Sequence, residues 1–262
     1  MELTPGKRGQ STVIGFILLF GFLILVLSLF QAEVVPNQNA EIEFQHYQEA
    51  RDDMTELYTE IITLGRSSSD EQVLVPVSLG TDYPPRLLFL NPPPAAGSVE
   101  STGDGTIEID GEVNAAELCE GDATTGLVYS PGYHVTTQPD IRYDNGLLYV
   151  ETADGENAVL EHSKIVDEGE INLYRLNGSL RTRSEAGTLP IELTGGVSNS
   201  TDNPQTVTRI RLPSELSTDK WNTTVLPPDI NATDAGGGRV ELTGFSGQYT
   251  VNCYSVGLGQ RP

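Results

Sequence analysis

The chain has few lysines and few cysteines, and it lacks the residue patterns that carry catalysis. Only three of its 15 basic residues are lysines, against 37 acidic residues, and the formal net charge is −22. A surface this acidic repels polyanions, which excludes nucleic acid as a partner. The sequence contains no GxSxG, P-loop or GxGxxG motif, and its three histidines, His46, His134 and His162, lack HxH or HxxxH spacing. We therefore expect no enzyme, no cofactor and no metal site.

Acidic residues are abundant enough that their proximity carries little information. Glu108 and Asp110 lie two positions apart, but in such a chain a solvated face explains them better than acid and base catalysis. The acidic residues of segment 103–111 define no ligand set for Ca²⁺ or Na⁺. An acidic, lysine-poor surface is typical of proteins from halophiles. In molar salt the Debye length falls to about 3 Å, so carboxylates repel one another less.

One long apolar segment dominates the N-terminal region. Residues 9–32 carry no charge, and residues 13–30 are apolar apart from two glycines and Ser28. At about 1.5 Å rise per residue, roughly 20 such residues cross a hydrocarbon core of about 30 Å. We predict a transmembrane helix over residues 10–32, in contact with membrane lipid. A cleaved secretory signal is the alternative, but no clean small-x-small site follows the apolar residues.

The charges at the two ends of this segment predict its orientation. Lys7 and Arg8 precede it and Glu33 follows it. The positive-inside rule then keeps the N-terminus in the cytoplasm and places everything after about residue 32 outside the cell. We expect a single-pass protein of the cell membrane.

The residues at the start of the segment form a more specific pattern. The stretch Lys7-Arg8-Gly9-Gln10-Ser11-Thr12-Val13-Ile14-Gly15 resembles the class III signal of archaeal type IV pilins and archaellins. The resemblance implies that a prepilin-type peptidase cuts between Gly9 and Gln10 and removes residues 1–9. That leader carries Glu2, Lys7 and Arg8, net +1, so the mature chain would carry −22 − 1 = −23.

The resemblance extends over residues 7–65, which are similar to uncharacterised pilin-like surface proteins of haloarchaea. It implies a location and possible pilin-like partner subunits, but no activity. Many pilins carry a Glu at mature position five, where this chain has Ile14. This departure bears on filament assembly more than on processing.

An amphipathic pattern follows Pro36 and predicts a stalk helix over residues 33–65. Asn37 or Asn39 is expected to cap its start and Gly65 its end, with a kink or interruption at Pro36. Two interpretations stay open: one helix from Gln10 to Leu64, about 80 Å long at 1.5 Å per residue, or a membrane anchor followed by a separate core helix. The apolar residues recur mostly at spacings of three and four: Ile42, Tyr47, Met54, Leu57, Tyr58, Ile61 and Leu64.

The remaining residues, 66–262, predict a β-rich extracellular head. Apolar residues alternate with polar ones, and turn-forming residues recur every eight to twelve positions, which favours an antiparallel all-β sandwich and an α+β fold class overall. Asn145-Gly146 predicts a type I′ hairpin turn. Residues 216–221 form the one short helix expected here. A boundary near residue 168 would divide the head in two, and one elongated domain is the favoured alternative. The predicted strands are 72–79, 86–90, 106–113, 147–152, 170–176, 189–193, 206–212 and 248–256.

Cys119 and Cys253 are the two cysteines, and both fall outside the membrane in this topology. A disulfide is the physical default outside the cell, and two reduced, buried thiols are the alternative. Four N-glycosylation sequons occupy the same half of the chain and indicate an exposed surface. They begin at Asn177, Asn199, Asn222 and Asn231.

These observations support a pilin-like, membrane-anchored surface protein that is a subunit or minor subunit of a type IV pilus-like filament, with a role in adhesion or surface contact. The alternative is a single-pass binding module that stays in the bilayer and never enters a filament. An extracellular hydrolase on a β scaffold is the third alternative.

Overall fold

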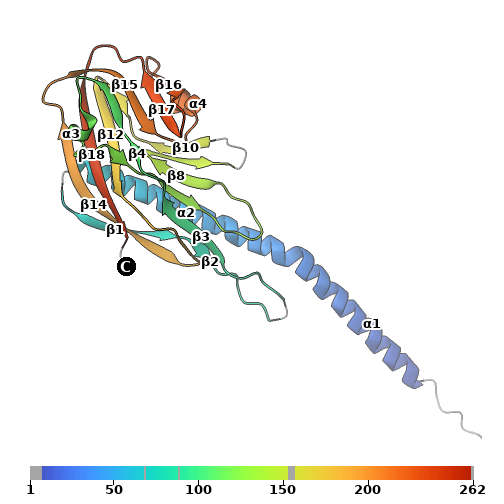
Figure 1. Ribbon diagram of the computed structural model, residues 1–262. Helices are drawn as coiled ribbons and strands as arrows, with labels where there is room; N and C mark the ends of the chain where they lie inside the picture. Colours follow the sequence, from blue (N-terminus) through green and yellow to red (C-terminus); the bar gives the residue numbers. More distant parts are fainter. Residues whose placement is uncertain (1–7, 68, 88, 153–156, 261–262) are drawn as a thin grey trace, which may run out of the picture.

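The protein forms a long helical rod that projects from a β-rich head (Figure 1). The computed structural model describes residues 8–67, 69–87, 89–152 and 157–260. Helix α1 (Arg8–Leu29), a π-helical turn η1 (Phe30–Val34) and helix α2 (Val35–Ser67) follow one another without a gap. α1 extends away from the head, whereas α2 runs through it. The predicted fold class, a long N-terminal helix followed by a β-sandwich head, is confirmed, and so is a single long helix.

Pro36 does not interrupt this helix. Its ring would clash with the carbonyl four residues earlier, and it offers no N–H. The preceding residues form a π turn, in which the Val35 N–H donates to the Phe30 carbonyl. A π turn is a common way to absorb such an irregularity. The predicted cap at Asn37 or Asn39 is wrong because both residues lie inside α2, which also continues past Gly65 to Ser67.

The head contains two large sheets. Nearly all strand pairs are antiparallel, but β12 and β18 pair in parallel. A two-stranded sheet, β4 (Gly105–Thr106) and β6 (Ala123–Thr124), lies beside them. The nine-stranded sheet runs β1-β14-β18-β15-β17-β16, with β12 joined to β18, β11 to β12 and β5 to β15; the seven-stranded sheet runs β10-β9-β8-β7-β3-β13, with β2 joined to β3.

The strand bounds of the first sheet are β1 (Gln72–Ser78), β5 (Glu108–Gly111), β11 (Val166–Asp167), β12 (Glu170–Gly178), β14 (Thr188–Ser200), β15 (Gln205–Pro213), β16 (Asn231–Asp234), β17 (Arg239–Thr243) and β18 (Gln248–Gln260). Those of the second are β2 (Gly80–Thr81), β3 (Ala95–Ser101), β7 (Leu127–Ser130), β8 (Asp140–Asp144), β9 (Leu147–Glu151), β10 (Asn157–His162) and β13 (Arg183–Glu185).

Seven of the eight predicted strand segments lie on strands, but the segment 86–90 does not. Its described residues belong to the connection between β2 and β3, in which Arg86, Phe89 and Leu90 contact the long helix, as described below. Leu88 lies outside the described residues. The hairpin prediction is confirmed: Asp144 pairs with Leu147, and Asn145 and Gly146 have φ angles of 45° and 80°. The short helix is shifted, since α4 (Thr218–Lys220) leads into a π turn η2 (Trp221–Val225), and α3 (Ala115–Leu118) was not predicted.

α2 fills the space between the two sheets in the half of the head nearer α1. Its apolar face packs against β1, β14 and β18 on one side and against β8 and β9 on the other. Burying one face against each sheet makes the helix a central part of this core. The rod therefore cannot separate from the head without exposing the core to water.

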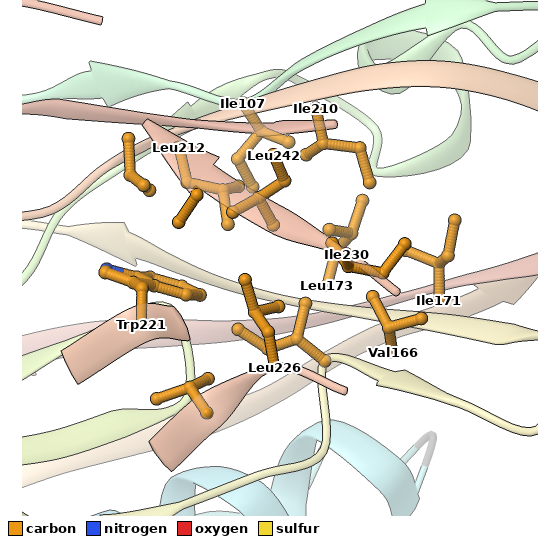
Figure 2. Close-up of a cluster of buried hydrophobic side chains, with 14 of the residues drawn as sticks. Ile107, Val166, Ile171, Leu173, Ile210, Leu212, Trp221, Leu226, Ile230 and Leu242 are labelled. Carbon is orange, nitrogen blue, oxygen red and sulfur yellow. The ribbon is translucent and has the colours of Figure 1, made fainter. Parts of the chain in front are cut away.

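The other half of the head has its own core, in which the sheets meet without the helix (Figure 2). Trp221 of η2 is fully buried in this core, to which β15, β17 and β12 also contribute side chains. Residues on both sides of position 168 contribute to this core, and residues 167–170 form the tight turn between β11 and β12.

Candidate functional site: the long helix and its junction with the head

The apolar part of the helix is exposed along its length. The large apolar side chains between Val13 and Leu29 are 46–69% accessible, except that of Leu27, which is half-buried. This is the one helix in the described part of the chain that is long and apolar enough to cross a membrane. Because water disfavours such a surface, it requires lipid or a protein partner. The architecture fits a membrane-anchored, single-pass surface protein.

The proposed processing site lies at the beginning of this helix. α1 begins at Arg8, so the bond between Gly9 and Gln10 lies in its first turn. Lys7 lies outside the described residues.

A buried carboxylate joins the helix to the head. Glu43 of α2 is fully buried, and its two oxygens accept hydrogen bonds from the backbone N–H groups of His134, Val135 and Thr136 at 2.7–3.1 Å. The hydroxyls of Tyr83 and Thr136 also donate to it. Burial alone would raise the pKa of Glu43, but the hydrogen bonds from Tyr83, His134 and Thr136 outweigh it and lower the pKa. An ionised carboxylate therefore holds two loops against the helix.

Further polar contacts continue along α2. Asp53 accepts the Ser78 N–H at 2.7 Å, and the Tyr58 hydroxyl lies 3.0 Å from that of Ser163. His46 Nδ1 lies 2.7 Å from the Tyr133 hydroxyl, and burial lowers the pKa of His46. These bonds reach loops and strands of both sheets, so they fix the rotation and height of the helix within the head.

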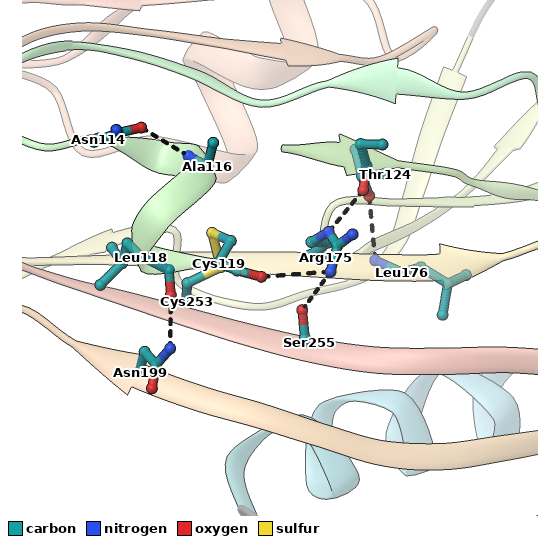
Figure 3. Close-up of a disulfide and its surroundings, with 11 residues drawn as sticks. Asn114, Ala116, Leu118, Cys119, Thr124, Arg175, Leu176, Asn199, Cys253 and Ser255 are labelled. Atoms are coloured by element: carbon teal, nitrogen blue, oxygen red, sulfur yellow. Dashed lines mark hydrogen bonds between the residues drawn. A yellow bond between two sulfur atoms is a disulfide. The ribbon is translucent and has the colours of Figure 1, made fainter. Parts of the chain in front are cut away.

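The predicted disulfide is confirmed. Cys119 follows α3 and Cys253 lies on β18, with their Cα atoms 5.4 Å apart (Figure 3). The buried Arg175 guanidinium lies beside this bond and donates to the Cys119 carbonyl at 3.4 Å and to the Ser255 hydroxyl at 3.2 Å. Desolvation lowers the pKa of Arg175. The crosslink holds α3 on the surface of the nine-stranded sheet.

The four sequons differ in their surroundings. Asn177, Asn222 and Asn231 are exposed. The side-chain amide of Asn199 is half-buried and donates to the Leu118 carbonyl at 2.9 Å. The Asn222 amide makes two bonds to the backbone of Ala232. The Asn199 and Asn222 amides would have to give up these bonds to be modified, which favours Asn177 and Asn231 as acceptors.

The carboxylates singled out by sequence lie in ion pairs. Glu108 contacts Arg211 at 3.1 Å and Arg239 at 2.9 Å, and Asp110 contacts Arg209 at 2.8 Å. The arginines on β15 also reach Glu241 on β17. No group of three or more His, Cys, Asp or Glu side chains that could hold a metal ion occurs among the described residues.

A polar cavity of about 570 Å³ lies where the β8–β9 hairpin meets the ends of β4, β6 and β15. Its lining includes Asp144, which accepts from the hydroxyls of Tyr149 at 2.7 Å and Ser214 at 3.2 Å. Burial raises the pKa of Asp144 to about 6. The cavity brings together a carboxyl group and hydroxyls that sequence reasoning did not connect.

Sequence reasoning also missed the role of Glu43. The predicted stripe included Ile42, which is only partly buried, whereas Glu43 is fully buried. Glu43, Tyr47, Ala50, Met54 and Leu57 follow one another at spacings of three and four. A charged residue that continues an apolar stripe was the signal that could have identified Glu43 as the residue that holds two loops against the helix.

Comparison with known proteins adds a relative but no activity. No protein-family model matches the chain, and no solved structure matches it. An uncharacterized protein of Archaeoglobus fulgidus is 22% identical over 195 residues, which cover 71% of this chain and 32% of that protein. The chain thus spans about a third of this relative's length, and the relative's name states no activity.

Proposed function

We propose that the protein is a pilin-like surface protein that is processed after Gly9 by a prepilin-type peptidase and becomes a subunit or minor subunit of a type IV pilus-like filament. The observation that carries this proposal is the exposed apolar helix that continues, without a gap, into the core of the head. The resemblance around Lys7 to Gly15 supports the processing step. In the orientation that the positive-inside rule predicts, the N-terminus is cytoplasmic and the head is extracellular.

The function would be mechanical. The apolar side chains of residues 13–30 first contact lipid, and later pack against the same segment of neighbouring subunits. Both environments remove the same side chains from water, so one surface serves in both states. α2, held between the two sheets and by Glu43, would transmit force from the helix to the head. The head would mediate adhesion or surface contact without catalysis.

The second candidate is a single-pass binding module that remains in the bilayer. The cavity lined by Asp144 supports it, since ligand sites are concave and carry a few polar groups that orient the ligand. Ile14 at mature position five is a further argument for a protein that stays in the membrane. The two candidates share the membrane anchor and differ in whether helices of several copies come into contact.

Processing is tested by the N-terminal mass of the protein isolated from its native membrane. We expect the mature chain to begin at Gln10 and Gly9→Val to keep the leader. Gly6→Val changes the same residue type within the leader and should be processed normally. An intact Met1 in the unaltered protein would contradict pilin-type processing, and an N-terminus beyond Phe30 would contradict the membrane anchor as well.

Assembly is tested by crosslinking within the apolar segment. Both native cysteines are in the disulfide, so Phe20→Cys supplies a single reactive thiol. We expect crosslinked dimers in purified surface filaments, and no dimer when the thiol is placed on the exposed surface of the head by Asn231→Cys. Absence of the protein from every filament preparation would contradict assembly and leave the anchored module.

A further inference from the structure

The connection between β2 and β3 carries an exposed apolar tip. We define the proline-flanked loop as residues 82–87 and 89–94, and its tip as Leu87, Phe89 and Leu90. Leu87 is 100% accessible and Leu90 83%, whereas Leu74, an exposed leucine on β1, is 43% accessible. The tip is the most exposed group of large apolar side chains in the described part of the head.

The tip lies where the apolar segment of the helix ends. The ring of Phe89 packs on that of Phe30, with centroids 4.7 Å apart, and Phe30 is the last residue of the apolar stretch. The backbone of Leu90 is hydrogen-bonded to the side chain of Gln31, which follows Phe30 in the helix. If residues 13–30 cross the hydrocarbon, these contacts place Phe89 and Leu90 at its outer boundary.

Part of the loop's backbone has no unpaired N–H group that would need water. The Gln31 side chain donates to the Leu90 carbonyl at 3.0 Å and accepts the Leu90 N–H at 3.1 Å, so both backbone groups of Leu90 are paired. The five prolines of the loop, at positions 84, 85 and 92–94, have no N–H to satisfy. Irregular backbone does not lie exposed to lipid within the hydrocarbon core, so the tip can reach only the interface between the headgroups and the acyl chains.

A positive charge lies behind the apolar tip. Arg86 donates to Gln38 and Asn39 of α2, each at 2.9 Å, and to Asn91 within the loop. No ion pair of Arg86 occurs among the described residues, although the chain carries a large excess of carboxylates. Gln38 and Asn39 lie about two turns beyond Gln31, or about 10–12 Å along the helix. This depth suits an arginine among lipid phosphates, with its apolar neighbours below it.

We propose that the tip of the proline-flanked loop inserts into the outer leaflet and that Arg86 contacts lipid phosphates. The loop is then a second membrane contact, beside the helix, that sets the height and tilt of the head. This proposal rests on the membrane anchor, which both candidate functions share, and not on filament assembly. We assign lipid as the partner of the tip because Phe89 and Leu90 contact Phe30 and Gln31, at the end of the segment that crosses the bilayer.

The test places a fluorescent NBD label on single cysteines of the full chain in anionic phospholipid vesicles that contain spin-labelled lipids. Leu87→Cys reports the tip, Leu74→Cys reports an exposed leucine of the head, and Leu23→Cys reports the helix inside the bilayer. We expect lipids labelled near the headgroup to quench position 87 at least threefold more than position 74. Lipids labelled deep in the chain should quench position 23.

The outcomes separate this proposal from the anchor itself. Quenching at 23 without quenching at 87 overturns the loop contact and leaves the anchor intact, whereas quenching at neither position contradicts both. A label at 87 that is shielded from water, unquenched by lipid and crosslinked to a second copy would show that a neighbouring subunit covers the tip instead. Leu90→Asp, combined with Leu87→Cys, should abolish the quenching at 87 while that at 23 persists.

Discussion

The carboxylate of Glu43 on α2 binds the backbone of residues 134–136 and so holds the helix against the head. Glu43→Gln replaces an acceptor oxygen by an NH₂ group that faces backbone N–H donors, and we expect it to lower the free energy of unfolding by about 2–4 kcal/mol. Thermal and denaturant unfolding of the full chain in detergent micelles measures this. Glu56→Gln, an exposed glutamate on the same helix, should change stability little.

The effect of Glu43 should depend on pH in a defined direction. Its folded-state pKa is lowered, so its stabilisation is present above the unfolded pKa near 4.3 and is lost as the pH falls through the lower folded value. The difference in stability between the wild type and Glu43→Gln should therefore shrink below about pH 4. A stability difference between the two proteins that stays constant down to pH 2 would contradict an ionised Glu43 in the folded state.

Asp144 should show the opposite dependence. Its folded-state pKa is raised to about 6, so the folded protein binds more protons than the unfolded chain between about pH 4 and pH 6. Stability contributed by this group falls as the pH rises through that range, by up to about 3 kcal/mol. Relative to Asp144→Asn, the wild type should lose stability from pH 4 to pH 7. Parallel pH profiles of the two proteins would refute this assignment.

At the scale of elements, the disulfide joins the short helix α3 to the long strand β18. It closes a loop of 134 residues, and by loop-closure entropy it should contribute on the order of 4 kcal/mol. We expect Cys119→Ala/Cys253→Ala to unfold at correspondingly lower denaturant concentration. Reduction should destabilise the wild type and leave the double variant unchanged. Equal sensitivity of both proteins to the reductant would show that the effect does not come from this bond.

The sequons also belong to elements, because their strands and turns decide which amides are accessible. We expect glycopeptide mass spectrometry of the native protein to find higher occupancy at Asn177 and Asn231 than at Asn199 and Asn222. The latter two amides already donate to backbone carbonyls at 2.9 Å and 3.0 Å. Full occupancy at Asn222 with an unmodified Asn231 would contradict this ordering.

At the scale of the whole molecule, the net charge of −22 should make stability depend on ionic strength. We expect the unfolding temperature to rise between about 0.1 M and 1 M salt, as the Debye length falls from about 10 Å to 3 Å and repulsion between carboxylates weakens. NaCl and KCl should act alike, because screening depends on ionic strength. An unfolding temperature that falls with salt would show that ion pairs such as Glu108 with Arg239 dominate instead.

The sequence by itself determined the features whose cause is local. An apolar stretch of 18 residues forms a helix because only intrahelical bonds satisfy its backbone away from water. Asn145-Gly146 forms its turn because both residues tolerate positive φ. Alternating residues defined most long strands, and two cysteines outside the membrane left one disulfide pairing to consider.

Only the tertiary structure decided the features whose partners lie far apart in sequence. Segment 86–90 has the composition of a strand, yet Gln31, 59 residues before Leu90, pairs with its backbone in place of a neighbouring strand. Nothing in the sequence near Glu43 identifies its partner, because the fold brings it to Thr136, 93 residues away. The local sequence pattern carries no information about these long-range contacts. They form when α2 packs between the two sheets, because the burial of apolar side chains in the cores determines which loops reach the helix.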